Sequence, residues 1–221
     1  MTDAKATDPL TRSMATGDED FSIGGFADDV AAVVDRLPFP RFFLVGHSLG
    51  ASVASCFAGR YPDRLQGLIL VDFGGDPRDD GPAELAWLMD GLAPANFETF
   101  AEQAMKTCLR GARTGVADRV LAGLKATPRN SFSGAVLGLM DFDPVASLAH
   151  GPDRKLHLYS SFLDTMGLVP IHQRVHGMEA EQIPDCSHWV HLDGPELFNQ
   201  SLQQWLNPAS PHPPFQPPPE G

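Results

Sequence analysis

The sequence predicts an α/β domain in which a mostly parallel sheet is flanked by helices. Two apolar runs, residues 42–45 (FFLV) and 68–71 (LILV), have the unbroken hydrophobic character of strands buried on both faces of a parallel sheet. The segment between them predicts a helix from Leu49 to about Tyr61, where Pro62 ends it. Residues 42–71 therefore form one strand–helix–strand crossover unit, the building block of parallel sheets.

An amphipathic helix is predicted before this unit, at residues 24–37. Apolar residues recur there at helical spacing, and Pro38 cannot continue a helix. Residues 1–20 are polar and show no sustained period, so we expect a loop there.

Residues 74–151 change character and predict helices without a convincing strand. This composition suits a lid inserted above a sheet. Three apolar stripes support the interpretation, at 97–109, 116–124 and 132–140. Their side chains are expected to pack in a core, and on a lid they would also wall a substrate pocket.

The sheet is predicted to resume after the lid. Residues 156–159 alternate as a half-buried strand does, 178–183 predict a weaker strand, and 197–206 predict a last amphipathic helix. The tail beyond it contains seven prolines, which indicates an extended segment without a packed core. The predicted divisions are 1–73 for the N-terminal part of the core, 74–151 for the helical lid, 152–207 for the C-terminal part of the core, and 208–221 for a disordered tail.

Charge and cysteine content narrow the function classes. A formal net charge of -12 and a pI near 4.9 argue against nucleic acid and anionic membranes as partners, because both repel an acidic protein. The three cysteines, Cys56, Cys108 and Cys186, are far apart and odd in number, which favours reduced thiols and a cytoplasmic location. The polar N-terminus contains no apolar stretch typical of a signal peptide or a membrane span.

The pentapeptide Gly46-His47-Ser48-Leu49-Gly50 stands directly between the first predicted strand and the helix that follows it. In this context a Gly-x-Ser-x-Gly pattern predicts a nucleophile elbow, whose sharp turn holds the serine in a strained backbone conformation with Oγ exposed. Side chains at either glycine are expected to collide across so tight a turn. We therefore expect Ser48 to be a nucleophile.

A serine hydroxyl is a poor nucleophile at neutral pH, so Ser48 needs a histidine base. His188 lies between the last predicted strand and the last helix, on a loop at the carboxyl edge where open α/β sheets bind ligands. His191 would point elsewhere, and His47 flanks the nucleophile instead of facing it. His188 is the predicted base.

The base usually needs a carboxylate that orients it. Asp164 follows a predicted strand and precedes His188, which matches the chain order serine, aspartate, histidine. Asp72, at the end of the 68–71 strand, is the rival candidate, although a strand-end aspartate commonly caps a turn. We expect Asp164 to fill this role.

No cofactor or metal is expected. The chain contains no His-Glu-x-x-His pattern and no phosphate-binding Gly-x-Gly-x-x-Gly pattern. Cys186 and His188 alone lack the third and fourth ligands that a zinc site requires.

With Ser48, Asp164 and His188 in place, the chain resembles the α/β-hydrolase superfamily, especially its branch of small bacterial esterases, haloperoxidase-like enzymes and carbon–carbon bond hydrolases. The resemblance covers 42–71, 143–164 and 184–206, and it includes the segment DCSHWVHLDGPE that surrounds the predicted base. Ser187 stands where that superfamily usually has glycine. Serine at the elbow disfavours the haloalkane dehalogenase and epoxide hydrolase branches, which place aspartate there.

The resemblance implies an oxyanion hole with two backbone N–H donors. One is Leu49, and the other belongs to a His-Gly loop that follows an early strand; this loop and the early strands do not precede the elbow here. The resemblance thus implies an N-terminally truncated hydrolase fold, from a fragment or a mis-started reading frame. Loss of one donor lowers turnover roughly a hundred- to a thousandfold. The 42–45 strand would then be an exposed apolar edge open to pairing, for example in a homodimer.

Three functions remain open at this point. The first is a serine hydrolase that acts on a small carboxylic ester or related acyl substrate through an acyl-enzyme. The second keeps the same three residues but cleaves a carbon–carbon bond beside a carbonyl, or performs perhydrolysis. The third is a catalytically impaired remnant that binds a ligand or partner through the lid.

Overall fold

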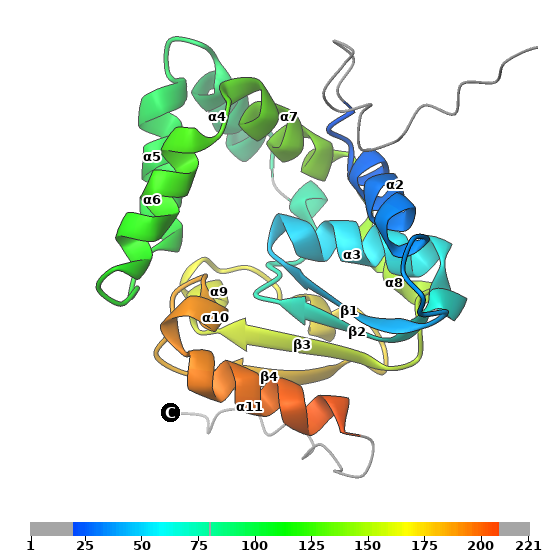
Figure 1. Ribbon diagram of the computed structural model, residues 1–221. Helices are drawn as coiled ribbons and strands as arrows, with labels where there is room; N and C mark the ends of the chain where they lie inside the picture. Colours follow the sequence, from blue (N-terminus) through cyan, green and yellow to red (C-terminus); the bar gives the residue numbers. More distant parts are fainter. Residues whose placement is uncertain (1–19, 80, 208–221) are drawn as a thin grey trace, which may run out of the picture.

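The computed structural model describes residues 20–79 and 81–207 (Figure 1). The loop predicted for the first twenty residues, apart from Asp20, and the predicted proline-rich tail lie outside the described residues. Along the described part of the chain, no helix combines the length and the apolar character that a membrane span requires.

A four-stranded parallel sheet forms the centre of the molecule. Its strands are β1 (Phe42–His47), β2 (Leu65–Val71), β3 (Lys155–Ser160) and β4 (Glu179–Ile183), and they lie in the order β1-β2-β3-β4. Every neighbouring pair is parallel. The parallel sheet, the crossover between the first two strands and the return of the sheet after residue 151 are therefore confirmed.

Helices cover both faces of this sheet (Figure 1). One face packs against α2 (Ile23–Val34), α3 (Leu49–Arg60) and α8 (Pro144–Ala149), and the other packs against α11 (Pro195–Leu206), which follows the short α10 (Val190–Asp193). The arrangement is a three-layer α/β fold of the class that alternating strands and helices produce.

The two cores follow from the alternation of side chains along β2. Leu68 and Leu70 are fully buried in the core beneath α2 and α3. Ile69 and Val71 point to the other face, where Trp205 of α11 is buried. An apolar side chain of this size contributes roughly 1.5–3 kcal/mol when it is fully buried, so β2 stabilises both layers at once.

Local signals set the ends of the helices. The Ser22 hydroxyl accepts a hydrogen bond from the Gly25 N–H at 2.9 Å, which caps the first turn of α2. Pro62 follows the end of α3, and Pro195 opens α11 at a position where a missing N–H costs little. These three helices lie within two or three residues of their predicted bounds.

The edge position of β1 corrects one prediction and confirms another. Burial on both faces is wrong for this strand, because Val45 is 44% exposed and the residues before it are only partly buried. Among the described strands, β1 pairs only with β2. The expectation of an exposed apolar edge is confirmed. Both-face burial does hold for β2 and β3, which have neighbours on each side.

Between residues 74 and 151 the described chain contains helices and no strand, as predicted. The helices before α8 are α4 (Pro82–Leu92), α5 (Phe97–Cys108), α6 (Val116–Ala126) and α7 (Arg129–Met140). They form an arch beyond the carboxyl ends of the strands, and α7 returns to contact α2 and α3 (Figure 1). The remaining short segments are η1 (Pro62–Arg64), η2 (Pro77–Asp79), α9 (Phe162–Thr165) and η3 (Ile171–Gln173).

Candidate active site

Ser48 lies in the turn between β1 and α3. Its backbone is strained, with φ 53° and ψ -121°, and its N–H donates to the carbonyl of Val71 at 3.1 Å. A Cβ on Gly46 would lie 2.2 Å from the Gly50 carbonyl oxygen, so this turn requires glycine at position 46. A Cβ on Gly50 would meet nothing within 4 Å, so the expected collision occurs at only one of the two glycines.

His188 lies on the loop between β4 and α10, at the carboxyl edge of the sheet. Its Nε2 is 2.7 Å from the Ser48 hydroxyl oxygen, and its side chain is almost completely buried. The backbone N–H of His188 donates to the carbonyl of Cys108 at 3.2 Å, which attaches this loop to the end of α5. The structure therefore brings the predicted nucleophile and base into direct contact.

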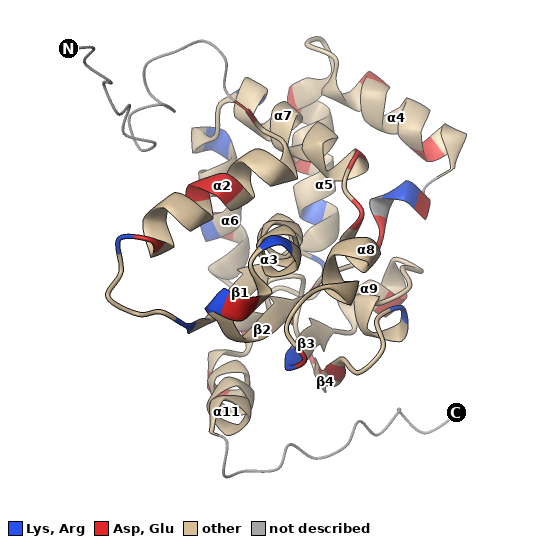
Figure 2. Ribbon diagram, turned by 90° about the vertical axis from the view of Figure 1, so that its right-hand side faces the viewer, with Lys and Arg blue, Asp and Glu red and all other residues tan. Residues whose placement is uncertain are grey.

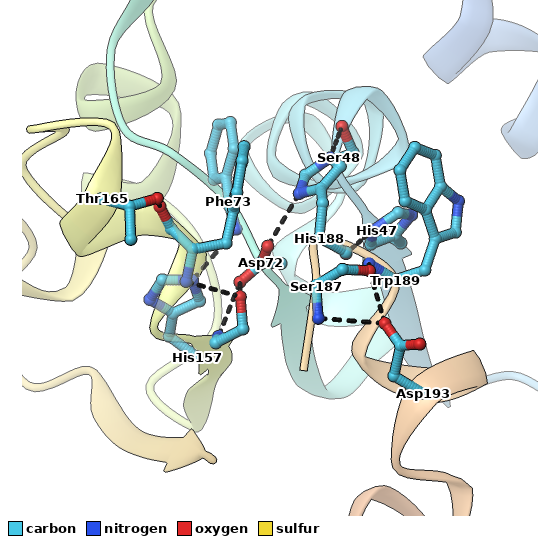
Figure 3. A network of polar contacts seen from close by, with 12 residues as sticks. His47, Ser48, Asp72, Phe73, His157, Thr165, Ser187, His188, Trp189 and Asp193 are labelled. Carbon is cyan, nitrogen blue, oxygen red and sulfur yellow. Dashed lines mark hydrogen bonds and ion pairs between the residues drawn. The ribbon is translucent and has the colours of Figure 1, made fainter. Parts of the chain in front are cut away.

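The carboxylate beside His188 is Asp72 and not Asp164. Asp72 Oδ2 lies 2.7 Å from His188 Nδ1, and Figure 3 shows Ser48, His188 and Asp72 in one continuous line of contacts. Asp164 is exposed, and its carboxylate accepts a hydrogen bond from the Gln182 amide at 3.0 Å. The prediction of Asp164 is corrected because this residue lies in α9 and bonds to Gln182, whereas Asp72 contacts the base.

Asp72 is held by the neighbouring strand. Both the N–H and the hydroxyl of Ser160 donate to Asp72 Oδ1, at 2.7 and 2.9 Å. The Asp72 N–H donates to the Leu158 carbonyl at 2.8 Å, although the residue has a left-handed backbone with φ 47°. With Oδ1 occupied in this way, Oδ2 is left to face His188.

His157, at the centre of β3, supports the same turn. The N–H of Phe73 donates to His157 Nε2 at 3.1 Å, so this nitrogen carries the lone pair and the proton resides on Nδ1. His157 Nδ1 then donates to His172 Nδ1 at 2.9 Å. Complete burial, followed by the neighbouring His172, lowers the pKa of His157 well below its usual value, so the ring is neutral.

Two further histidines surround the base. The ring of His47 lies 4.7 Å from that of His188 and 4.9 Å from that of His191, measured between centroids. His47 Nε2 is 2.7 Å from the His188 carbonyl oxygen. Burial, followed by the proximity of His188, lowers the pKa of His47 to about 3, so neutral His47 donates this hydrogen bond and fixes the loop. His47 thus flanks the serine as predicted.

A buried aspartate joins the histidine loop to the helices above it. Asp193 Oδ1 accepts the Arg113 N–H at 2.7 Å from the connection between α5 and α6. Asp193 Oδ2 accepts the N–H of Ser187 at 2.9 Å and also the Ser187 hydroxyl, as Figure 3 shows. Asp193 therefore connects the chain just before His188 to the arch of helices.

Leu49 is the first residue of α3. The first N–H groups of a helix have no acceptor within it, and they carry the positive end of the helix dipole. The Leu49 N–H is thus suited to stabilise negative charge that develops next to Ser48.

Sequence reasoning missed the supporting residues Ser160, His157 and Asp193. Asp72 was available as the rival candidate, and its position at the end of a fully apolar strand is the signal that favours it. Nothing in the local pattern marks Ser160 or His157, because their role depends on the β2–β3 register, in which Leu70 pairs with His157. Among the described residues, no group of three or more His, Cys, Asp or Glu side chains could hold a metal ion.

A model of the α/β hydrolase fold family matches residues 6–132, which is more than half of the chain. The chain belongs to the α/β hydrolase family. Solved structures of this fold superimpose on most of the chain. One of them is an esterase from Thermogutta terrifontis, solved with malate bound, which superimposes with a TM-score of 0.66 at 21% sequence identity. The superposition includes 84% of this chain and 72% of the esterase chain. This likeness confirms the hydrolase fold.

Two relatives are similar in sequence. A serine hydrolase-like protein of Danio rerio is 38% identical over 50 residues, 23% of this chain and 15% of that protein. An abhydrolase domain-containing protein of Schizosaccharomyces pombe is 24% identical over 194 residues, 74% of this chain and 66% of that protein. This α/β hydrolase chain thus spans less than two thirds of the length of either relative.

Proposed function

We propose that this chain is a serine hydrolase that cleaves a small carboxylic ester or a related acyl substrate. The observation that carries the proposal is the 2.7 Å contact between Ser48 Oγ and His188 Nε2, continued by the 2.7 Å contact between His188 Nδ1 and Asp72 Oδ2. The esterase among the structural neighbours supports the same reaction class. Membership of the family leaves the substrate open, because a fold does not determine it.

The arrangement can carry out acyl transfer in two steps. Asp72 holds the proton of His188 on Nδ1, so the Nε2 lone pair accepts the Ser48 hydroxyl proton as the oxygen attacks the ester carbonyl. The Leu49 N–H stabilises the resulting oxyanion. His188 then returns the proton to the departing alcohol and leaves an acyl-serine. Water, deprotonated by His188, then attacks the acyl-serine, and His188 returns this proton to Ser48 Oγ as the acid is released.

A fluorophosphonate probe tests the proposal, because it phosphonylates only an activated serine. Wild type, Ser48→Ala and His188→Ala are treated and the adduct mass is measured, with Ser161→Ala, an exposed serine at the end of β3, as the matched control. We expect the probe to label wild type and Ser161→Ala, and to leave Ser48→Ala and His188→Ala unlabelled. Unlabelled wild type with an intact circular dichroism spectrum would contradict the proposal and favour a binding role.

A further inference from the structure

A pocket of about 450 Å³ lies beside the histidine loop, between α6 and the segment 189–192. We call it the α6 pocket. Its lining is mostly apolar and includes Val120, Leu124, Phe132, Trp189 and Leu192. Its polar side chains are those of Arg119, Thr127 and His191.

Ring contacts connect this pocket to the reacting residues. The Trp189 ring meets the His188 ring edge-on, with 5.2 Å between centroids, and lies beside His47 in Figure 3. His191 contacts His47, the residue directly before the nucleophile, at 4.9 Å. The pocket therefore borders the loop that carries the base, on the side that faces the arch of helices.

Arg119 is the cation of this pocket. It is exposed on α6, where Figure 2 shows basic residues, and within the described part of the chain its guanidinium group forms no ion pair or hydrogen bond. Asp193, which follows the pocket-lining residues His191 and Leu192 in the chain, has other partners, because it accepts hydrogen bonds from the backbone N–H groups of Arg113 and Ser187. No carboxylate lines the α6 pocket in the described structure.

A second pocket, of about 550 Å³ between α5 and α6, provides the contrast. Its lining contains the acids Glu98 and Glu102 together with the bases Lys125 and Arg129, so its charges balance. The α6 pocket, which borders the loop that carries His188, is instead lined, among the described residues, by an arginine and by no carboxylate, in a protein of net charge -12.

We propose that the α6 pocket binds the non-reacting part of the substrate and that Arg119 binds a carboxylate group on it. The inference rests on the proposed function and narrows the substrate class to esters that carry a free carboxylate on a short apolar chain. A guanidinium pairs with a carboxylate through two parallel hydrogen bonds. His191 contributes a neutral hydrogen-bonding ring, since burial, Arg119 and His188 all lower its pKa.

Two esters of equal length test the proposal. The 4-nitrophenyl ester of pentanoic acid is neutral, and the mono-4-nitrophenyl ester of glutaric acid carries a carboxylate in place of the terminal methyl group. We expect wild type to prefer the anionic ester in kcat/KM, and Arg119→Gln to reduce this preference about tenfold, mainly through KM. Arg129→Gln, in the charge-balanced pocket, is the matched control and leaves the preference unchanged. An equal preference in wild type and Arg119→Gln would overturn the inference.

Binding of glutarate to Ser48→Ala, measured by calorimetry, separates this inference from the hydrolase proposal. In one outcome, Arg119→Gln weakens glutarate binding about tenfold but the protein with Ser48 intact hydrolyses neither ester. This result would support the anion site and contradict the ester hydrolase proposal. Hydrolysis of both esters, without any dependence of glutarate binding on Arg119, would reject the anion site and retain the hydrolase. Binding through Arg119 should also weaken with added salt, because the side chain is exposed.

Discussion

The carboxyl ends of β2 and β3 lie side by side and each leads to an aspartate, yet the two aspartates have opposite environments. Asp72 at the end of β2 is fully buried and accepts hydrogen bonds from Ser160 as well as contacting His188. Asp164, one turn beyond β3, is exposed and bonds to Gln182. The comparison teaches that a carboxylate can orient a histidine only where the fold buries and fixes it, whatever its place in the chain order.

The largest effect should come from Asp72→Asn. The amide keeps the shape of the side chain but favours the wrong tautomer of His188, so we expect kcat to fall by about 10⁴. Ester hydrolysis by wild type and variant, with thermal unfolding as the check on folding, measures it. If Asp72→Asn retained most of the activity, the base would be oriented by another group.

The second expected effect concerns acid stability at the carboxyl end of β1, where His47 lies. The pKa of His47 is lowered to about 3 by burial, so between about pH 6.5 and pH 3 the unfolded chain binds a proton that the folded chain does not. Neutral His47 therefore contributes to the free energy of unfolding above pH 6.5. This contribution is lost as the pH falls, by about 2 kcal/mol at pH 5.

Denaturant unfolding at pH 7.5 and pH 5 measures this loss. His47→Gln preserves a donor for the His188 carbonyl but removes the titrating ring, so its stability should fall less on acidification. His176→Gln, at an exposed position, should follow wild type. Parallel behaviour of all three proteins would show that other groups dominate acid unfolding.

A smaller effect is expected for Ser160→Ala. It removes one of the two donors to Asp72 Oδ1 and leaves the Ser160 N–H in place, so the carboxylate becomes less firmly positioned. We expect kcat to fall about tenfold, and the free energy of unfolding to fall by about 1–3 kcal/mol because a buried acceptor loses a partner. Rescue of kcat by Ser160→Thr would assign the effect to the hydroxyl; failure of Thr to rescue it would indicate altered packing instead.

The smallest effect should come from Asp164→Asn. The side chain is exposed and its partner Gln182 can bond to an amide as well as to a carboxylate, so kcat should stay within about twofold of wild type. The same kinetic assay compares it directly with Asp72→Asn. A large loss here, with Asp72→Asn unaffected, would reverse the assignment of the two aspartates.

The sequence was sufficient for the features that depend on local patterns. The apolar runs predicted the strands, the prolines predicted the helix ends, and the glycine-flanked serine predicted the turn at Ser48. The identity of the carboxylate depended on strand register and burial, which no local pattern encodes. Chain order favoured Asp164, whereas the pairing of β2 with β3 places Asp72 next to Leu158 and Ser160.

The hydrogen bond between the His188 N–H and the Cys108 carbonyl makes one peptide amide a reporter of the arch of helices. If the last turn of α5 lifts away, this amide loses its acceptor and exchanges its hydrogen with solvent. The Cys108 thiol beside it, whose pKa burial raises to about 11, would at the same time become reactive toward alkylating agents. Hydrogen exchange at the His188 amide and alkylation of the Cys108 thiol thus report the same opening event. Equal rates for the two reactions would show that the arch of helices separates from the His188 loop in one step.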